Sequence, residues 1–129
     1  YNNLAAVLIE QKKMPEAIAQ FEKALALNPL EDQIKHNLAV ACSQRGLELG
    51  EAGQLDESLR LLRRAVELKP DMATAHHNLG CALSAAGQRD AAIAAFQEAL
   101  RLQPNYRLAR INLQRLQKTP ATGGTPASP

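Results

Sequence analysis

Apolar residues along the chain recur at the spacings of amphipathic helices, and they do so in pairs of segments. In the first segment of a pair they fall at i, i+4 and i+7, as in Ile34, Leu38 and Ala41. The second segment carries a broader apolar stripe. Its clearest members are Ala92, Ile93, Phe96, Ala99 and Leu100. No segment alternates with the two-residue period of a half-buried strand. The pattern therefore predicts an all-α protein built from helix pairs.

The helix pair is itself repeated along the chain. Pro29, Pro70 and Pro104 each close a run rich in Ala and Leu, and they stand 41 and 34 residues apart. Each proline has an alanine five residues before it, a large apolar residue eight before it and an asparagine eight after it. These residues are Ala24, Ala65 and Ala99; Phe21, Leu62 and Phe96; and Asn37, Asn78 and Asn112. Agreement at so many positions indicates an internal repeat.

Turn and capping residues mark the helix boundaries within each unit. Gly53 and Gly87 stand between the two helices of a pair, where glycine adopts a left-handed backbone at little cost. Asp56 and Asp90 follow, and acidic residues are favoured in the first turn of a helix. The prolines end the second helix, because proline disfavours helical backbone at the preceding residue.

The combined pattern resembles the tetratricopeptide repeat, a helix-turn-helix unit of 34 residues. The match is best over residues 73–104. There the family's positions are occupied by Leu79, Gly80, Gly87, Ala92, Phe96, Ala99 and Pro104. The resemblance implies a right-handed superhelical solenoid of antiparallel helix pairs, with about three repeats and a C-terminal capping helix. It also implies that the chain binds other proteins and is not an enzyme.

Placed on this repeat, the chain divides into five segments. They are unit one at 1–29, with a truncated first helix; unit two at 30–70, with a seven-residue insertion; unit three at 71–104; the capping helix at 105–118; and a tail at 119–129 that we expect to be disordered. Because unit one begins partway through its first helix, we expect further chain before it. Its uncovered apolar surface is expected to favour weak self-association.

The insertion in unit two allows two interpretations. Gly46 and Gly53 both align with Gly87, which places the extra residues at 47–53. Seven residues make almost two helical turns and nearly preserve the helix face, so we expect one long helix running toward Gly50. Because a helical glycine costs about 1 kcal/mol relative to alanine, a loop is the alternative.

The repeat also predicts which side chains form the core. We expect the residues at the recurring apolar positions to be buried between the stacked helices. They are Leu4, Leu8, Ala17, Phe21, Ala24, Leu38, Ala65, Leu79, Ala92, Phe96, Ala99 and Leu113.

Composition and charge give no reason to expect a nucleic-acid or membrane partner. The chain carries 15 Lys and Arg against 13 Asp and Glu, a net charge of only +2. No apolar run approaches the length of a membrane span. The basic residues after Glu98 suit solvation of a capping helix, and steering of an acidic partner is the alternative reading. Cys42 and Cys81 lie within predicted helices, which argues against a disulfide-linked secreted module. The sequence leaves the localisation open, with a cytoplasmic one favoured.

Candidate catalytic and metal-binding groups are sparse. There is no glycine-rich phosphate loop and no supported nucleophile-base pair, so we expect neither catalysis nor a cofactor. His77 and Cys81 stand four residues apart on one helix face, and His36 occupies the position of His77 one repeat earlier. Zinc sites use four ligands, or three and a water, and no further ligand is evident. We therefore expect no metal.

By the resemblance, the first helix of each unit lines a concave groove. Asparagine recurs at the sixth position of these helices, and it resembles the asparagine ladder of O-linked N-acetylglucosamine transferase repeats. A carboxamide both donates and accepts hydrogen bonds, so such a ladder can pair with the backbone of an extended peptide. The alternative is that each asparagine bonds only to its neighbouring helix. The candidate peptide-binding residues are Asn3, His36, Asn37, Val40, His77, Asn78, Asn112 and Arg115.

These patterns leave three hypotheses for function. The first is recognition of an extended protein or peptide segment in the groove, with micromolar affinity. The family's clamp for acidic C-terminal tails is not expected, because Asn2, Thr74 and Asn78 stand where it needs Lys or Arg. The second hypothesis is an architectural, self-assembling role. The third is an accessory domain that regulates a fused enzyme.

Overall fold

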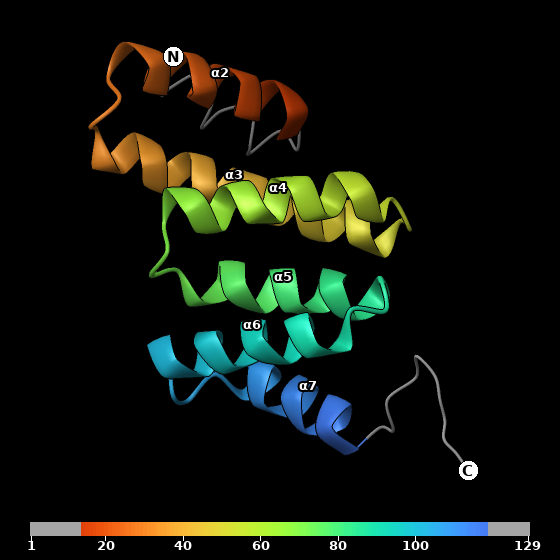
Figure 1. Cartoon of the computed structure of the whole chain (residues 1–129). Coiled ribbons are helices and arrows are strands. Elements are labelled where there is room, and N and C mark those ends of the chain that lie inside the picture. Colours follow the sequence, from red (N-terminus) through yellow and green to blue (C-terminus); the bar gives the residue numbers. More distant parts are fainter. Residues whose placement is uncertain (1–13, 119–129) are drawn as a thin grey trace.

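The computed structural model describes residues 14–118, which form six helices stacked one after another (Figure 1). This part of the chain contains no strand. The helices are α2 (Met14–Leu27), α3 (Asp32–Glu51), α4 (Leu55–Leu68), α5 (Ala73–Ala85), α6 (Arg89–Leu102) and α7 (Arg107–Lys118). The predicted all-α class is confirmed. The expected first helix of unit one, with Asn3, Leu4 and Leu8, and the expected disordered tail lie outside the described residues.

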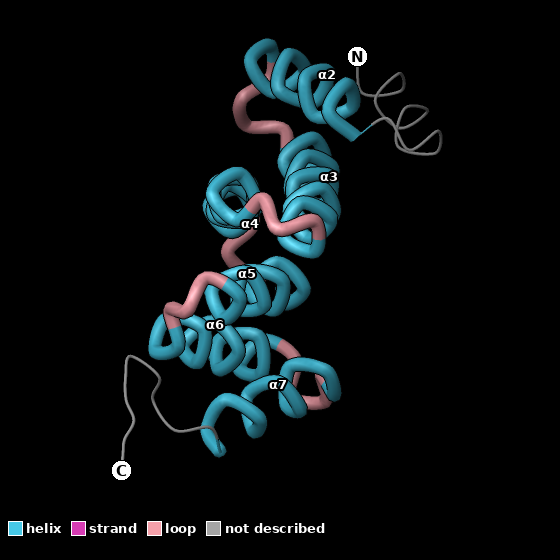
Figure 2. The backbone as a smooth tube through the Cα atoms, turned by 90° about the vertical axis from the view of Figure 1, so that its right-hand side faces the viewer, coloured by secondary structure: helices cyan, strands magenta, loops and turns pink. Residues whose placement is uncertain are grey.

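The helices from α3 onward form two rows. Viewed end-on, α3, α5 and α7 lie on one side of the stack and α4 and α6 on the other (Figure 2). Helix α3 packs against α4 and α5 against α6, while α3 and α5 also pack directly on each other. Each unit therefore buries its apolar side against the next, as in a solenoid. We call the surface formed by α3, α5 and α7 the first-helix face.

Glycine turns connect the two helices of each pair, as predicted. Gly53 has φ +85° and Gly87 has φ +80°, a left-handed conformation that only glycine adopts without strain. In each turn the residue after the glycine donates its backbone N–H to a carbonyl five residues earlier, at 2.8 Å for Gln54 and 2.9 Å for Gln88. These bonds satisfy helix-end carbonyls and fix the antiparallel direction of the following helix.

Helix α3 is continuous over 20 residues, so the long helix is confirmed and the loop is excluded. Gly46 lies in its middle and faces Leu62 on α4, where an added Cβ would lie 2.6 Å from the Leu62 Cγ. Gly80 on α5 faces Phe96 on α6 in the same way, with the ring 2.8 Å from an added Cβ. Gly46 thus corresponds to Gly80. The extra seven residues precede Gly46, and their expected location at 47–53 is wrong.

Two clusters of buried side chains form the core. Phe21 and Leu38 belong to the cluster around α2, α3 and α4, and Phe96 and Leu62 to the cluster between α4, α5, α6 and α7. Of the expected core residues, those confirmed as buried are Ala17, Phe21, Ala24, Leu38, Ala65, Ala92, Phe96 and Ala99.

Leu79 and Leu113 were expected in the core, and this expectation is wrong. Both are only partly buried and pack at the edge of the second cluster. On α5 the centre of the buried face is formed by Gly80 and Leu83, which leaves Leu79 at its margin. On α7 the buried side chain is Ala109, and Leu113, one turn further along, is only partly buried.

Within residues 14–118 no helix combines the length and the apolar character required to cross a lipid bilayer.

Candidate functional site

The recurring asparagines join neighbouring helices of the first-helix face. Asn78 on α5 donates from Nδ2 to the Ser43 Oγ on α3 at 2.8 Å. Asn112 on α7 donates from Nδ2 to the His77 Nε2 on α5 at 3.0 Å. Both bonds span 35 residues, so the same contact recurs one repeat later. For Asn78 and Asn112 this geometry agrees with the alternative that an asparagine bonds to its neighbouring helix. Asn78 uses one N–H donor in this way, whereas the Asn112 Nδ2 also donates to the Cys81 Sγ at 3.8 Å.

Asn37 occupies a different level of the face. Its Oδ1 accepts a hydrogen bond from the Gln33 Nε2 within α3, at 3.0 Å. The residue of α3 that meets Asn78 is Ser43, six positions further along the helix. The extra turns of α3 place Asn37 further from the α5 end of this contact, so Asn78 meets Ser43 and not Asn37.

His77 lies in the packed junction of α5, α6 and α7, with 7% of its surface exposed. Its ring lies 5.6 Å from the Phe96 ring and 5.0 Å from the Tyr106 ring, measured between centroids, and is tilted against both by 52° and 37°. Because Nε2 accepts from Asn112, we assign the proton to Nδ1, which then donates to the Asn78 Oδ1 at 3.3 Å. Burial lowers the pKa of His77 below its ordinary value, so the ring is neutral near pH 7.

The other predicted residues lie at the surface. His36 and Arg115 are exposed on α3 and α7, and Val40 is partly exposed. Asn3 lies outside the described residues. The Cys81 Sγ lies 3.8 Å from the His77 Nε2. Among residues 14–118, however, no group of three or more His, Cys, Asp or Glu side chains could hold a metal ion.

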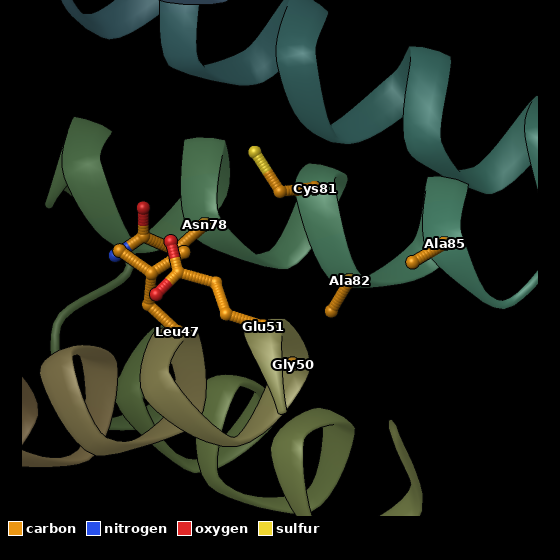
Figure 3. Close-up of a pocket in the computed structure, with 7 residues that line it drawn as sticks. All are labelled: Leu47, Gly50, Glu51, Asn78, Cys81, Ala82 and Ala85. Atoms are coloured by element: carbon orange, nitrogen blue, oxygen red, sulfur yellow. The ribbon is translucent and has the colours of Figure 1, made fainter. Parts of the chain in front are cut away.

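A pocket of about 170 Å³ opens between α3 and α5 (Figure 3). Leu47 and Glu51 extend from α3 toward Asn78 on α5, and Cys81 lies one turn further along α5. The complete lining is Leu47, Gly50, Glu51, Asn78, Cys81, Ala82 and Ala85. We call this hollow the α3–α5 pocket.

A second hollow of about 190 Å³ opens beside it, between α5 and α7. Its lining is Cys81, Ser84, Phe96, Asn112, Arg115 and Leu116. Most of these residues follow lining residues of the α3–α5 pocket by 34 positions, so the two hollows are equivalent in the repeat. Their chemistry differs, because the first carries the carboxylate of Glu51 and the second the guanidinium of Arg115.

Most of the α3–α5 pocket could not be predicted from the sequence. Leu47, Gly50 and Glu51 fall in the predicted insertion at 47–53, whose two possible structures place these residues differently on the face. One signal was available: Leu47 and Cys81 stand 34 residues apart, as do Gly50 and Ser84. That spacing places each pair at equivalent positions of neighbouring units.

Both cysteines are free thiols with raised pKa values. Cys42 is fully buried, and burial raises its pKa to about 12. Cys81 is partly exposed between the two hollows. Its pKa is raised first by burial and then by the negative charge of Glu51.

The position of α7 is fixed by a side chain from α6. Arg89, at the start of α6, donates from Nε and Nη2 to the Leu116 carbonyl oxygen at 3.1 and 2.9 Å. A cation at the C-terminal end of a helix complements the helix dipole and satisfies an unpaired carbonyl. This contact holds the end of α7 that carries Arg115 beside the second hollow.

Comparison with known proteins assigns the family. Tetratricopeptide repeat models match residues 1–71 and 73–106, and the chain belongs to the tetratricopeptide repeat family. No curated protein matches the chain significantly.

Solved structures of the same fold include two peptide complexes. The first tetratricopeptide domain of Spaghetti (RPAP3) bound to an HSP90 peptide has a TM-score of 0.65 and 20% identity, over 91% of this chain and 87% of that one. The second such domain of human RPAP3 with an HSP70 peptide has a TM-score of 0.64 and 19% identity, over 91% and 92%.

A third similar structure is a mutant O-GlcNAc transferase from Thermobaculum terrenum. It shares 29% identity with a TM-score of 0.57 over 87% of this chain. The match covers 20% of the transferase chain, so the similarity concerns one part of that enzyme.

Proposed function

We propose that this chain is a protein-interaction module that binds an extended segment of a partner across the first-helix face. The observation that carries the proposal is the pair of adjacent hollows, equivalent in the repeat and both bordered by Cys81. A continuous segment lying across α5 can place side chains in both. Similar structures in complex with HSP90 and HSP70 peptides support this use of the fold.

Asparagines of the face are proposed to read the backbone of the bound segment. A carboxamide has two N–H donors and an oxygen with two lone pairs, and the bond to the neighbouring helix uses one donor. Asn78 can therefore serve the solenoid and the ligand together, and Asn112, whose Nδ2 bonds to His77 and Cys81, would meet the ligand through its oxygen. Asn37, Val40, His36 and Arg115 would extend the contact surface toward its ends, and Asn3 would do so in unit one.

The described residues favour binding over chemistry. Tetratricopeptide repeats generally serve as interaction modules without catalytic activity, and His77 is neutral, packed and engaged with Asn112. With neutral side chains at Thr74 and Asn78, we propose a segment that is not read mainly through a terminal carboxylate. Micromolar affinity is expected, because few charges on the face can offset the ordering of a flexible ligand.

The test begins with a random peptide library displayed on phage and selected against the immobilised chain. Selected peptides are then synthesised, and their affinities are measured by calorimetry. Asn37→Ala combined with Asn78→Ala should weaken binding about tenfold, the scale of one to two lost hydrogen bonds. The control combines Glu67→Ala on α4 and Gln97→Ala on α6, both exposed and outside the first-helix face.

Unfolding by urea separates binding from stability in the same variants. The asparagine double variant should lose about 1–3 kcal/mol, because Asn78 bonds to the buried Ser43 hydroxyl and to the buried His77 ring. Unchanged affinity in that variant, or equal weakening in the control, would exclude the first-helix face as the binding surface.

Exposed apolar residues on α7 favour self-association as the second candidate function. Leu108 is 59% exposed and Ile111 is 41% exposed. A second copy or another protein could cover them, and the hydrophobic effect would drive that contact. Sedimentation over a range of concentrations tests this: a monomer at all concentrations would reject self-assembly.

A further inference from the structure

The α3–α5 pocket has the size of one large apolar side chain. Its volume of about 170 Å³ resembles the roughly 150 Å³ cavity that accepts benzene in an engineered protein core. Leu47, Ala82 and Ala85 supply apolar walls, and Gly50 completes the lining on α3. The equivalent hollow between α5 and α7 has Ser84 and Leu116 in place of Gly50 and Ala82. The small residues therefore distinguish the first pocket.

The pocket carries a single charge. Glu51 is the one ionisable acid or base with a full charge near pH 7 among its seven lining residues. Its carboxylate is exposed at the end of α3, and within the described part of the chain it joins no ion pair. A cation placed there gains attraction without breaking an existing contact.

We propose that this pocket receives one apolar side chain of the bound segment, and that a Lys or Arg two residues away from it pairs with Glu51. The inference rests on the proposed function and names the ligand chemistry of its site. In an extended segment successive side chains point to opposite faces, so residues i and i+2 face the same surface about 6.5–7 Å apart. That spacing suits an apolar group in the pocket and a cation at its rim.

The experiment uses the same random peptide library against three forms of the chain. Against the unaltered chain, we expect selected peptides to share an apolar residue with Lys or Arg two positions before or after it. Against Glu51→Lys, the basic residue should be replaced by Asp or Glu while the apolar residue is retained. The control is Glu67→Lys, which makes the same charge change at an exposed position of α4 and should leave the selected pattern unaltered.

Filling the pocket tests the apolar part separately. Ala85→Leu places a larger side chain at an exposed lining position, so the helix tolerates it while the pocket loses volume. Affinity for peptides selected on the unaltered chain should fall about tenfold, the order expected for excluding one apolar side chain. Ala94→Leu, the same exchange at an exposed position of α6, should bind normally.

Cys81 provides a direct measure of occupancy. Peptides bound across α5 should slow its alkylation by N-ethylmaleimide, because it borders both hollows. Peptides that protect Cys81 but lack the apolar-basic pattern, and that bind Glu51→Lys and Ala85→Leu normally, would overturn this inference and leave the proposed function standing. Failure to select any peptide that protects Cys81 would overturn both.

Discussion

The Asn112 carboxamide on α7 donates to the His77 Nε2 on α5, and this bond requires a neutral histidine. A second proton on the ring would convert the acceptor into a donor that faces the Asn112 N–H group. The same ring nitrogen lies 3.8 Å from the Cys81 Sγ. A neutral thiol does not stabilise a positively charged histidine as a carboxylate would. His77 therefore couples the position of α7 to its protonation state.

We predict that the chain loses stability on acidification because of His77. Its folded pKa lies below the ordinary value of 6.5, so the unfolded chain binds the proton at a higher pH. The contribution is fully present above pH 6.5 and declines as the pH falls through 6.5 toward the lower folded pKa. Melting temperatures at pH 7.5 and 5.5 should differ more for the unaltered chain than for His77→Gln.

His36→Gln is the matched control for that measurement, because His36 is exposed. It should keep the pH dependence of the unaltered chain. An equal loss of pH dependence in both variants would contradict the role assigned to His77.

Gly80→Ala should destabilise the chain by about 1–3 kcal/mol, the usual cost of overpacking. The added Cβ would lie 2.8 Å from the Phe96 ring, and α5 and α6 must separate to admit it. Ordinarily Gly→Ala stabilises a helix by about 1 kcal/mol, so even the sign is informative. Urea unfolding measures it, with Thr74→Ala at an exposed position of α5 as control. Gain of stability in Gly80→Ala would refute the close packing of α5 on α6.

Arg89→Ala should loosen α7 without unfolding the rest of the solenoid. The substitution removes both hydrogen bonds from Arg89 to the Leu116 carbonyl oxygen, which lies in the last turn of α7. Backbone amides of α7 should exchange with deuterium several-fold faster, while those of α3 and α4 remain protected. Arg63→Ala, at an exposed position of α4, is the control, and unchanged exchange in α7 would show that Arg89 does not secure the helix.

The two cysteines should react at very different rates. Cys42 is fully buried with a pKa near 12, so its thiolate is scarce and inaccessible in the folded chain. Cys81 is partly exposed and should be modified slowly by N-ethylmaleimide at pH 8, with Cys42 following only after addition of urea. Mass spectrometry of digested peptides distinguishes the sites. Early modification of Cys42 would contradict its burial in the core cluster around α2, α3 and α4.

The fold could be predicted from the sequence because its determinants are local and repeated. Gly53 and Gly87 specify left-handed turns by themselves, and Phe21 and Phe96 lie on stripes with helical spacing. The partial exposure of Leu79 could not be derived this way. It depends on how closely Gly80 lets α5 approach Phe96, which is a property of the packed pair.

The site was less predictable because it depends on register between helices. Proline spacing placed Asn37 and Asn78 at equivalent positions, whereas α3 presents Ser43 to Asn78. The difference arises from two additional helical turns before Gly46, which the contact of Gly46 with Leu62 locates. Periodicity tells on which face of its helix a residue lies. It does not tell which residue of the neighbouring helix that residue contacts.

The most direct test of the binding surface is a titration of isotope-labelled chain with a selected peptide, followed by nuclear magnetic resonance. Binding at the first-helix face predicts chemical-shift changes that cluster on α3, α5 and α7, with the largest changes around Cys81 and Asn78 between the two hollows. Exposed residues of α4 and α6, such as Glu67 and Gln97, should keep their shifts. Changes concentrated on α4 and α6, with Cys81 and Asn78 unaffected, would contradict the account.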